Sequence, residues 1–164
     1  MNGAFTALLA SEGFDVAGLD ASESGIAAAR ARHGGLPFAR HDLNAPLPEA
    51  HAGRYDAVVS LEVIEHLLLP RRLMECALAA LRPGGLVVVS TPFHGYLKNL
   101  ALALTGAFDA HWHPLSDYGH VKFFSRPTLT ELFLEYNLAG LEFSTAGRLP
   151  PLAKSMLLSG QSCS

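Results

Sequence analysis

Residues 55–66 read YDAVVSLEVIEH, an apolar run followed at once by two carboxylates and an imidazole. The run Ala57-Val58-Val59 is typical of a buried strand, and the polar residues follow where that strand would end. If the chain turns helical there, Glu62, Glu65 and His66 share one face, because positions i, i+3 and i+4 of a helix are neighbours. Open parallel sheets bind ligands at the carboxyl ends of their strands, so we expect a functional site here.

Strand-like and helix-like segments alternate through the chain, a pattern that indicates an α/β domain with a mostly parallel sheet. The chain has 164 residues, of which 49% are hydrophobic, and this is enough for a single domain, 1–164, with its own core. The expected strands are residues 14–19, 37–40, 55–60, 86–90, 138–144 and 154–158, the last two as an antiparallel pair at the sheet edge. The expected helices are residues 4–12, 22–34, 73–81, 96–104 and a segment that starts at Ser125.

A long stretch between the expected strand 86–90 and the last helix is rich in histidine and aromatic side chains. Stretches of this kind in compact domains are usually binding loops or lids. Residues 96–104 within it have an apolar helical pattern that could cover a pocket or face a lipid-like substrate, although core packing is the expected role. His94, His111 and Trp112 are candidates to line an acceptor pocket, but a loop histidine is more often simply solvated.

Charge and cysteine content narrow the classes of function. Twelve basic and fifteen acidic residues give a formal net charge of -3, so we expect no extended nucleic-acid surface and a small-molecule substrate. Cys76 and Cys163 have no paired spacing, which suits a reducing cytoplasm, and Cys76 is expected in the core of a helix. The longest apolar stretch, 97–108, is too short to span a bilayer, and the amino terminus lacks the pattern of a secretory signal. These features predict a cytoplasmic protein without a membrane span.

Several short segments occur in the order found in one enzyme family. They are Asn2-Gly3-Ala4-Phe5, Gly18-Leu19-Asp20, His41-Asp42-Leu43, residues 55–66 and Leu81-Arg82-Pro83-Gly84-Gly85. Over nearly its whole length the chain resembles class I S-adenosylmethionine-dependent methyltransferases, in the branch with ubiquinone-biosynthesis O-methyltransferase and the small-RNA terminal 2′-O-methyltransferase. Both carry a Glu-x-x-Glu-His stretch and a later His before an aromatic-rich helix start, which residues 120–125, HVKFFS, match here. The resemblance implies a Rossmann-like sheet and S-adenosylmethionine as the cofactor.

The same resemblance places the family's first strand and most of its glycine-rich loop ahead of this chain. Asn2 and Gly3 match the end of that loop. Because the first strand is central in the family's sheet, we expect that strand to be missing here and its neighbours to have unpaired edges. A second copy of the chain could fill such a gap, so a homodimer is one expected partner state.

Five residues are candidates for the cofactor site: Asn2, Gly3, Asp20, Asp42 and Leu43. Gly3 would let the backbone approach the methionine part of the cofactor, since it has no Cβ. Asp20, at a strand end, has the position of an acid that accepts from ribose hydroxyls; the alternative is that it only caps the next helix. By resemblance, Asp42 would accept from the adenine amino group and Leu43 would flank the ring. The alternative for Asp42 is an ordinary turn aspartate.

Glu62, Glu65, His66 and His120 form the candidate metal site, with His113 as the nearest substitute for His120. Two carboxylates and two imidazoles suit Mg²⁺, Mn²⁺ or a similar divalent ion. Such an ion could hold two adjacent hydroxyls of an acceptor and lower the pKa of the attacking one, so Glu62, His66 and His120 are also the candidate catalytic residues. The alternative is that the two glutamates only complement a helix dipole while His66 packs or caps.

Together these patterns predict an S-adenosylmethionine-dependent methyltransferase that methylates a hydroxyl of a small molecule, such as a polyphenol, quinol or sugar, with divalent-metal assistance. Two alternatives stay open. One is a metal-independent N- or C-methyltransferase in which the histidines and glutamates only shape the pocket. The other is an inactive truncated domain that serves as a binding or interaction module.

Overall fold

The computed structural model describes residues 2–112, 115–117, 119–147 and 153–163. The chain divides into two compact units, Met1–Leu47 and Pro48–Ser164. The expectation of one domain over 1–164 stays a prediction. Among the described residues, no helix combines the length and the apolar character needed to cross a membrane.

The first unit is a small α/β layer around one pair of strands. Its elements are α1 (Ala4–Ser11), β1 (Gly18–Asp20), α2 (Glu23–Arg32) and β2 (Phe38–Arg40). β1 and β2 are parallel, with Gly18 opposite Phe38 and Asp20 opposite Arg40. α2 begins after Ser22, whose hydroxyl accepts from the backbone N–H of Gly25 at 3.0 Å, as an N-cap should. A small core forms between α2 and β2 from Ile26, Ala29 and Phe38, with Leu36 packed against it.

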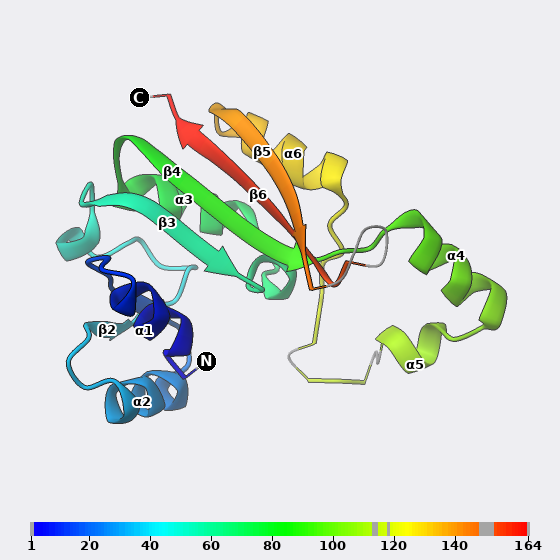
Figure 1. Cartoon of the computed structure of the whole chain (residues 1–164), viewed down its shortest axis with the longest axis horizontal. Helices are drawn as coiled ribbons and strands as arrows, with labels where there is room; N and C mark the ends of the chain where they lie inside the picture. Colours follow the sequence, from blue (N-terminus) through cyan, green and yellow to red (C-terminus); the bar gives the residue numbers. More distant parts are fainter. Residues whose placement is uncertain (1, 113–114, 118, 148–152, 164) are drawn as a thin grey trace. The chain divides into compact units, whose positions relative to one another are not determined.

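The second unit carries a four-stranded sheet. Its elements are η1 (Glu49–His51), β3 (Tyr55–Leu61), η2 (Ile64–His66), α3 (Arg71–Ala80), β4 (Leu81–Pro92), α4 (Tyr96–Thr105), α5 (Phe108–Trp112), α6 (Arg126–Glu135), β5 (Leu138–Ala146) and β6 (Ser155–Ser162). The strand order is β3-β4-β6-β5, and Figure 1 shows β6 inserted between β4 and β5. β3 and β4 are parallel, whereas β6 is antiparallel to both of its neighbours.

This architecture confirms the predicted α/β fold, mostly parallel with an antiparallel pair at the edge. The antiparallel strand itself is β6, one position in from the edge strand β5. Among the described residues β1 pairs only with β2, and β3 only with β4, so each has one unpaired edge.

The core of the second unit lies between its sheet and two helices. α3 contacts β3 and β4, while α6 contacts β5 and β6. The helices contribute Leu73, Met74, Cys76, Ala77 and Ala80 from α3, and Leu129, Leu132 and Phe133 from α6. The strands contribute Val87 and Val89 from β4, and Met156 and Leu158 from β6. The prediction that Cys76 packs in a helix core is confirmed.

α4 differs from its prediction. Its residues were expected to pack in the core, but none of them is buried. Tyr96 is 77% exposed and Leu104 is 79% exposed. The expectation of core packing is therefore wrong, because an apolar helical pattern does not say whether any surface is present to cover it.

Candidate functional site

The chain leaves β3 by a tight turn rather than by the expected α-helix. Glu62 has φ of 53°, a left-handed conformation that stops a helix from starting at this point. Its backbone N–H donates to the carbonyl and to the hydroxyl of Ser90, at 3.2 and 3.1 Å, which continues the contact with β4. Only residues 64–66 then form one 3₁₀ turn, with Ile64 fully buried beneath it. Glu62, Glu65 and His66 consequently do not share a helix face.

The turn nevertheless brings three predicted ligands together. Glu65, His66 and His120 each offer a ligand atom, and these atoms all lie within 4.8 Å of one another. The two imidazole rings meet edge to face, with their centroids 4.8 Å apart. Residues separated by more than fifty positions in the sequence thus form one cluster at the carboxyl end of β3.

Backbone hydrogen bonds from the segment before α6 hold His120 in this position. The backbone N–H groups of Val121 and Lys122 both donate to the carbonyl oxygen of Glu65, at 2.9 and 3.0 Å. The Nδ1 of His66 lies 3.2 Å from the carbonyl oxygen of Gly119. Because a carbonyl can only accept, Nδ1 is the protonated nitrogen, and Nε2 carries the lone pair that a metal would use.

Glu65 is the most unusual residue of the cluster. Its side chain is only 1% exposed, and neither carboxylate oxygen has a hydrogen-bond partner among the described residues. Burial raises the pKa of Glu65 above its usual value, with a smaller contribution from Glu62, while its own backbone N–H, the Thr91 hydroxyl and His66 lower it in part. The Thr91 hydroxyl is buried beside this carboxyl group and acts on its pKa, but it is not in hydrogen-bonding geometry with any described residue. A buried carboxylate normally has partners or binds a cation, so the donor set fits a divalent ion.

Glu62, the fourth predicted ligand, lies outside this group. Its carboxylate accepts a hydrogen bond from the Ser90 hydroxyl at 2.8 Å, and its side chain is exposed. It is close enough to act electrostatically on the cluster, because its charge raises the pKa of His120 and that of Glu65. The structure therefore places Glu62 beside the site, and its role as a metal ligand stays a prediction.

The neighbourhood of His120 also includes residues of the long stretch after β4. Burial lowers the pKa of His94 to about 4, and the charges of Lys98, His111 and His120 add to this effect. The ring of His94 packs edge to face against Phe123, at 5.6 Å between centroids. Burial also lowers the pKa of His120, with His66 as the next cause. His113, the predicted substitute for His120, lies outside the described residues.

Sequence reasoning missed three residues of this neighbourhood, Ser90, Thr91 and Lys98. Ser90 and Thr91 are polar residues directly after the apolar run of β4. Their position at the carboxyl end of a parallel strand is the same signal that identified Glu62 and Glu65. Lys98 gave no signal, because a single lysine in an apolar helix is ordinary.

The predicted cofactor residues belong to the first unit. Gly3 has φ of 75°, and a Cβ there would lie 2.8 Å from Cζ of Phe38 and 2.9 Å from Cβ of Ala29. Packing alone therefore requires glycine at this position, whatever the cofactor does. The side chain of Asn2 accepts from the backbone N–H of Ala4 at the start of α1.

The two aspartates lie at the carboxyl ends of the parallel strands β1 and β2. Asp20 ends β1 and accepts from the backbone N–H of Ser22 at 2.8 Å. Asp42 follows β2 and accepts from the backbone and side-chain nitrogens of Asn44, both at 2.9 Å, and these bonds lower its pKa. The turn role named as the alternative for Asp42 is thus present, whereas the N-cap of α2 is Ser22 and Asp20 bonds the backbone N–H of that cap residue. Contacts of Asp20, Asp42 and Leu43 with ribose and adenine stay predictions, as do those of Asn2 and Gly3.

Residues 2–142 match the family described as "Methyltransferase domain". A ubiquinone biosynthesis O-methyltransferase from Cereibacter sphaeroides is 33% identical over 129 residues, which cover 77% of this chain and 52% of that protein. A protein of the same name from a Caulobacter strain is 39% identical over 106 residues, covering 62% of this chain and 42% of that protein. The chain therefore spans about half the length of the curated relatives it matches.

A solved structure shows the same fold. The crystal structure of a SAM dependent methyltransferase from Archaeoglobus fulgidus superimposes with a TM-score of 0.72 at 14% identity. The match covers 98% of this chain and 82% of that one.

Proposed function

Because the chain belongs to the methyltransferase domain family, we propose that it transfers the methyl group of S-adenosylmethionine to a hydroxyl oxygen of a small molecule, with the help of a divalent cation. The observation that carries the metal assistance is the convergence of Glu65, His66 and His120, with a buried carboxylate that makes no hydrogen bond to any described residue. Relatives named for ubiquinone biosynthesis support an aromatic acceptor with adjacent hydroxyls, such as a quinol.

In this proposal the first unit binds the cofactor. Asp20, at the end of β1, accepts hydrogen bonds from the ribose hydroxyls. Asp42, which follows β2, accepts a hydrogen bond from the adenine amino group. Leu43 flanks the adenine ring, and the loop at Asn2 and Gly3 binds the methionine part. The low pKa of Asp42 supports this role, since an ionised carboxylate is the stronger acceptor.

Glu65, His66 and His120 would bind Mg²⁺ or Mn²⁺, and Glu62 would complete the set if its carboxylate turned from Ser90. A divalent ion held there would supply Lewis-acid chemistry, lowering the pKa of the acceptor hydroxyl. The protein contributes one buried negative charge from Glu65. It also contributes the imidazole of His120, whose lowered pKa favours the uncharged ring near neutral pH, and Nε2 of His66, whose Nδ1 donates to the carbonyl of Gly119.

The reaction itself needs little more from the side chains. The acceptor oxygen attacks the sulfonium methyl in line, the carbon–sulfur bond breaks, and a methyl ether and S-adenosylhomocysteine are released. The hydroxyl proton leaves to solvent or to a nearby base. Holding the two reactants in this alignment supplies much of the rate.

The test is methyl transfer from labelled S-adenosylmethionine to 3,4-dihydroxybenzoate, with added Mn²⁺ or with excess chelator. We expect transfer that the chelator abolishes and that Glu65→Gln lowers by at least about tenfold, since loss of a direct ligand should cost no less than loss of an outer one. Glu142→Gln, an exposed glutamate on β5, is the matched control and should keep full activity.

Two results would contradict parts of the proposal. Transfer that persists in chelator and in Glu65→Gln would support the metal-independent methyltransferase instead. Calorimetry that detects no binding of S-adenosylmethionine to this chain would leave the inactive binding module as the better account. If the cofactor binds, Asp20→Asn and Asp42→Asn should each weaken it.

A further inference from the structure

The surface of the second unit has two adjoining hollows that share Arg71. The first, which we call the acidic hollow, has a volume of about 680 Å³ and lies along α6. Its lining includes Glu131, Leu134 and Glu135. The second, the basic hollow, has a volume of about 290 Å³. Its lining includes Leu68, Leu69, Lys122 and Phe123.

Large apolar side chains are exposed in both hollows. Leu134 is 57% exposed in the acidic hollow, while Leu68 is 75% and Phe123 is 52% exposed in the basic one. Single exposed apolar residues are ordinary on protein surfaces, but a contiguous group rimmed by charges is typical of a protein-contact site. The two hollows together have this character.

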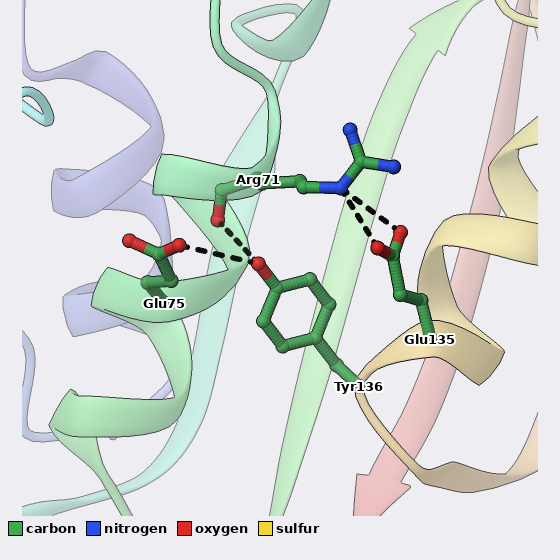
Figure 2. Close-up of polar contacts among 4 residues, drawn as sticks. All are labelled: Arg71, Glu75, Glu135 and Tyr136. Carbon is green, nitrogen blue, oxygen red and sulfur yellow. Dashed lines mark hydrogen bonds and ion pairs between the residues drawn. The ribbon is translucent and has the colours of Figure 1, made fainter.

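An ion pair fixes the point where the hollows meet. Nε of Arg71 donates to both carboxylate oxygens of Glu135, at 2.8 and 3.1 Å. The terminal nitrogens of Arg71 make no bond to the residues drawn in Figure 2, which shows this junction between α3 and the end of α6. The hydroxyl of Tyr136 lies within hydrogen-bond distance of the Arg71 carbonyl and of Glu75, at 3.3 and 3.4 Å, which ties the two helices together.

The two outer ends carry opposite charges, and the acidic end has two carboxylates, Glu131 and Glu135, beside the single cation Arg71. Lys122 lines the basic hollow and Glu131 lines the acidic one. Neither takes part in an ion pair within the described ranges, where the pairs are Arg71–Glu135, Arg72–Glu75 and Arg82–Asp56. The surface therefore has a cationic end at Lys122 and a net acidic end, where Arg71 is shared by Glu135 and Glu131.

We propose that this surface binds a second copy of the chain in a two-fold symmetric dimer. Rotation about an axis near the Arg71–Glu135 pair would place each Lys122 against the partner's Glu131. The same rotation would place Leu134 of each copy in the basic hollow of the other. A two-fold interface must be complementary to itself, and a patch with one cationic and one anionic end meets that condition. A uniformly acidic or basic partner would fit only one of the two hollows.

The experiment is sedimentation of the full chain between about 1 and about 200 μM, a range that covers a dissociation constant in the micromolar region. Lys122→Glu and Glu131→Lys should each weaken the dimer by at least about tenfold, because each places two like-charged pairs in the interface. An equimolar mixture of the two variants, and the double variant, should dimerise like the wild type. Leu134→Asp should also abolish the dimer, whereas Leu104→Asp on α4, more exposed than Leu134 but outside the hollows, should not.

Circular dichroism of each variant separates loss of the dimer from loss of the fold. A wild-type chain that sediments as a monomer throughout would overturn the inference. So would a dimer that both single reversals leave intact, or one that the mixture fails to restore. Binding of an added acidic or basic protein to a monomeric chain would also contradict it.

Discussion

Replacing Glu65 by glutamine should stabilise the metal-free protein and destabilise the metal-loaded one relative to the wild type. The substitution keeps the shape of the side chain but removes a charge that is 1% exposed and has no hydrogen-bond partner among the described residues. An unsatisfied buried group costs about 1–3 kcal/mol, and more when it is charged. We expect Glu65→Gln to raise the free energy of unfolding in chelator at pH 8 by about 1 kcal/mol, since the amide is also imperfectly bonded.

The pH dependence of this difference has a definite sign. The folded pKa of Glu65 is raised, so the folded state holds its proton more tightly than the unfolded state does. The contribution of Glu65 to the stability of the folded state is therefore most favourable below its usual pKa, and it is lost as the pH rises through the raised pKa of the folded state. The higher free energy of unfolding of Glu65→Gln should be present at pH 8, and its difference from the wild type should shrink towards pH 4.

Added Mn²⁺ should reverse the order of stability. A ligand present at a concentration one hundred times its dissociation constant stabilises the folded state by about 2.7 kcal/mol. Only the wild type should gain this stabilisation. Each kcal/mol raises the midpoint temperature of unfolding by about 2–4 °C, so the midpoint of the wild type should rise by roughly 5–10 °C. Thermal unfolding followed by circular dichroism, with Glu142→Gln as the control, measures both effects. If Glu65→Gln is less stable than the wild type in chelator, or gains as much from Mn²⁺, the reasoning is wrong.

Two further predictions concern α6 and His94. Ser125→Ala should lower the free energy of unfolding, measured by urea titration, by about 1 kcal/mol. The reason is that the Ser125 hydroxyl caps α6 through reciprocal hydrogen bonds with Thr128. An unchanged free energy of unfolding would show that the cap contributes nothing. Since burial lowers the pKa of His94 to about 4 from 6.5, stability should fall as pH drops below about 6.5. His94→Gln should reduce that loss, and a ring titration midpoint near 6.5 by NMR would contradict the lowered pKa.

Much of the fold was predictable because local signals agreed with long-range packing. Ser125 followed by Pro127 marked the start of α6, and the spacing of Leu73, Met74 and Ala77 marked the buried face of α3. These signals depend on a few neighbouring residues. They predict a helix and its buried face correctly when a sheet is present for that face to pack against.

The candidate site was predictable in membership but not in geometry. The sequence identified Glu65, His66 and His120, yet it implied an α-helix that would also align Glu62. The left-handed conformation of Glu62 arises from its contacts with Ser90 on a different strand, and no pattern of adjacent residues contains that information. The exposure of α4 was also not predicted, because the residues of a helix do not show which other parts of the chain pack against it.

Glu65, His66 and His120 should together bind one divalent ion. Calorimetric titration of the chelator-treated full chain with Mn²⁺ tests this binding most directly, alongside His120→Ala and a control, His33→Ala, at the end of α2. We predict one site in the wild type and in His33→Ala, and affinity at least about tenfold weaker in His120→Ala. Equal affinity in all three proteins, or no binding by the wild type, would contradict the claim.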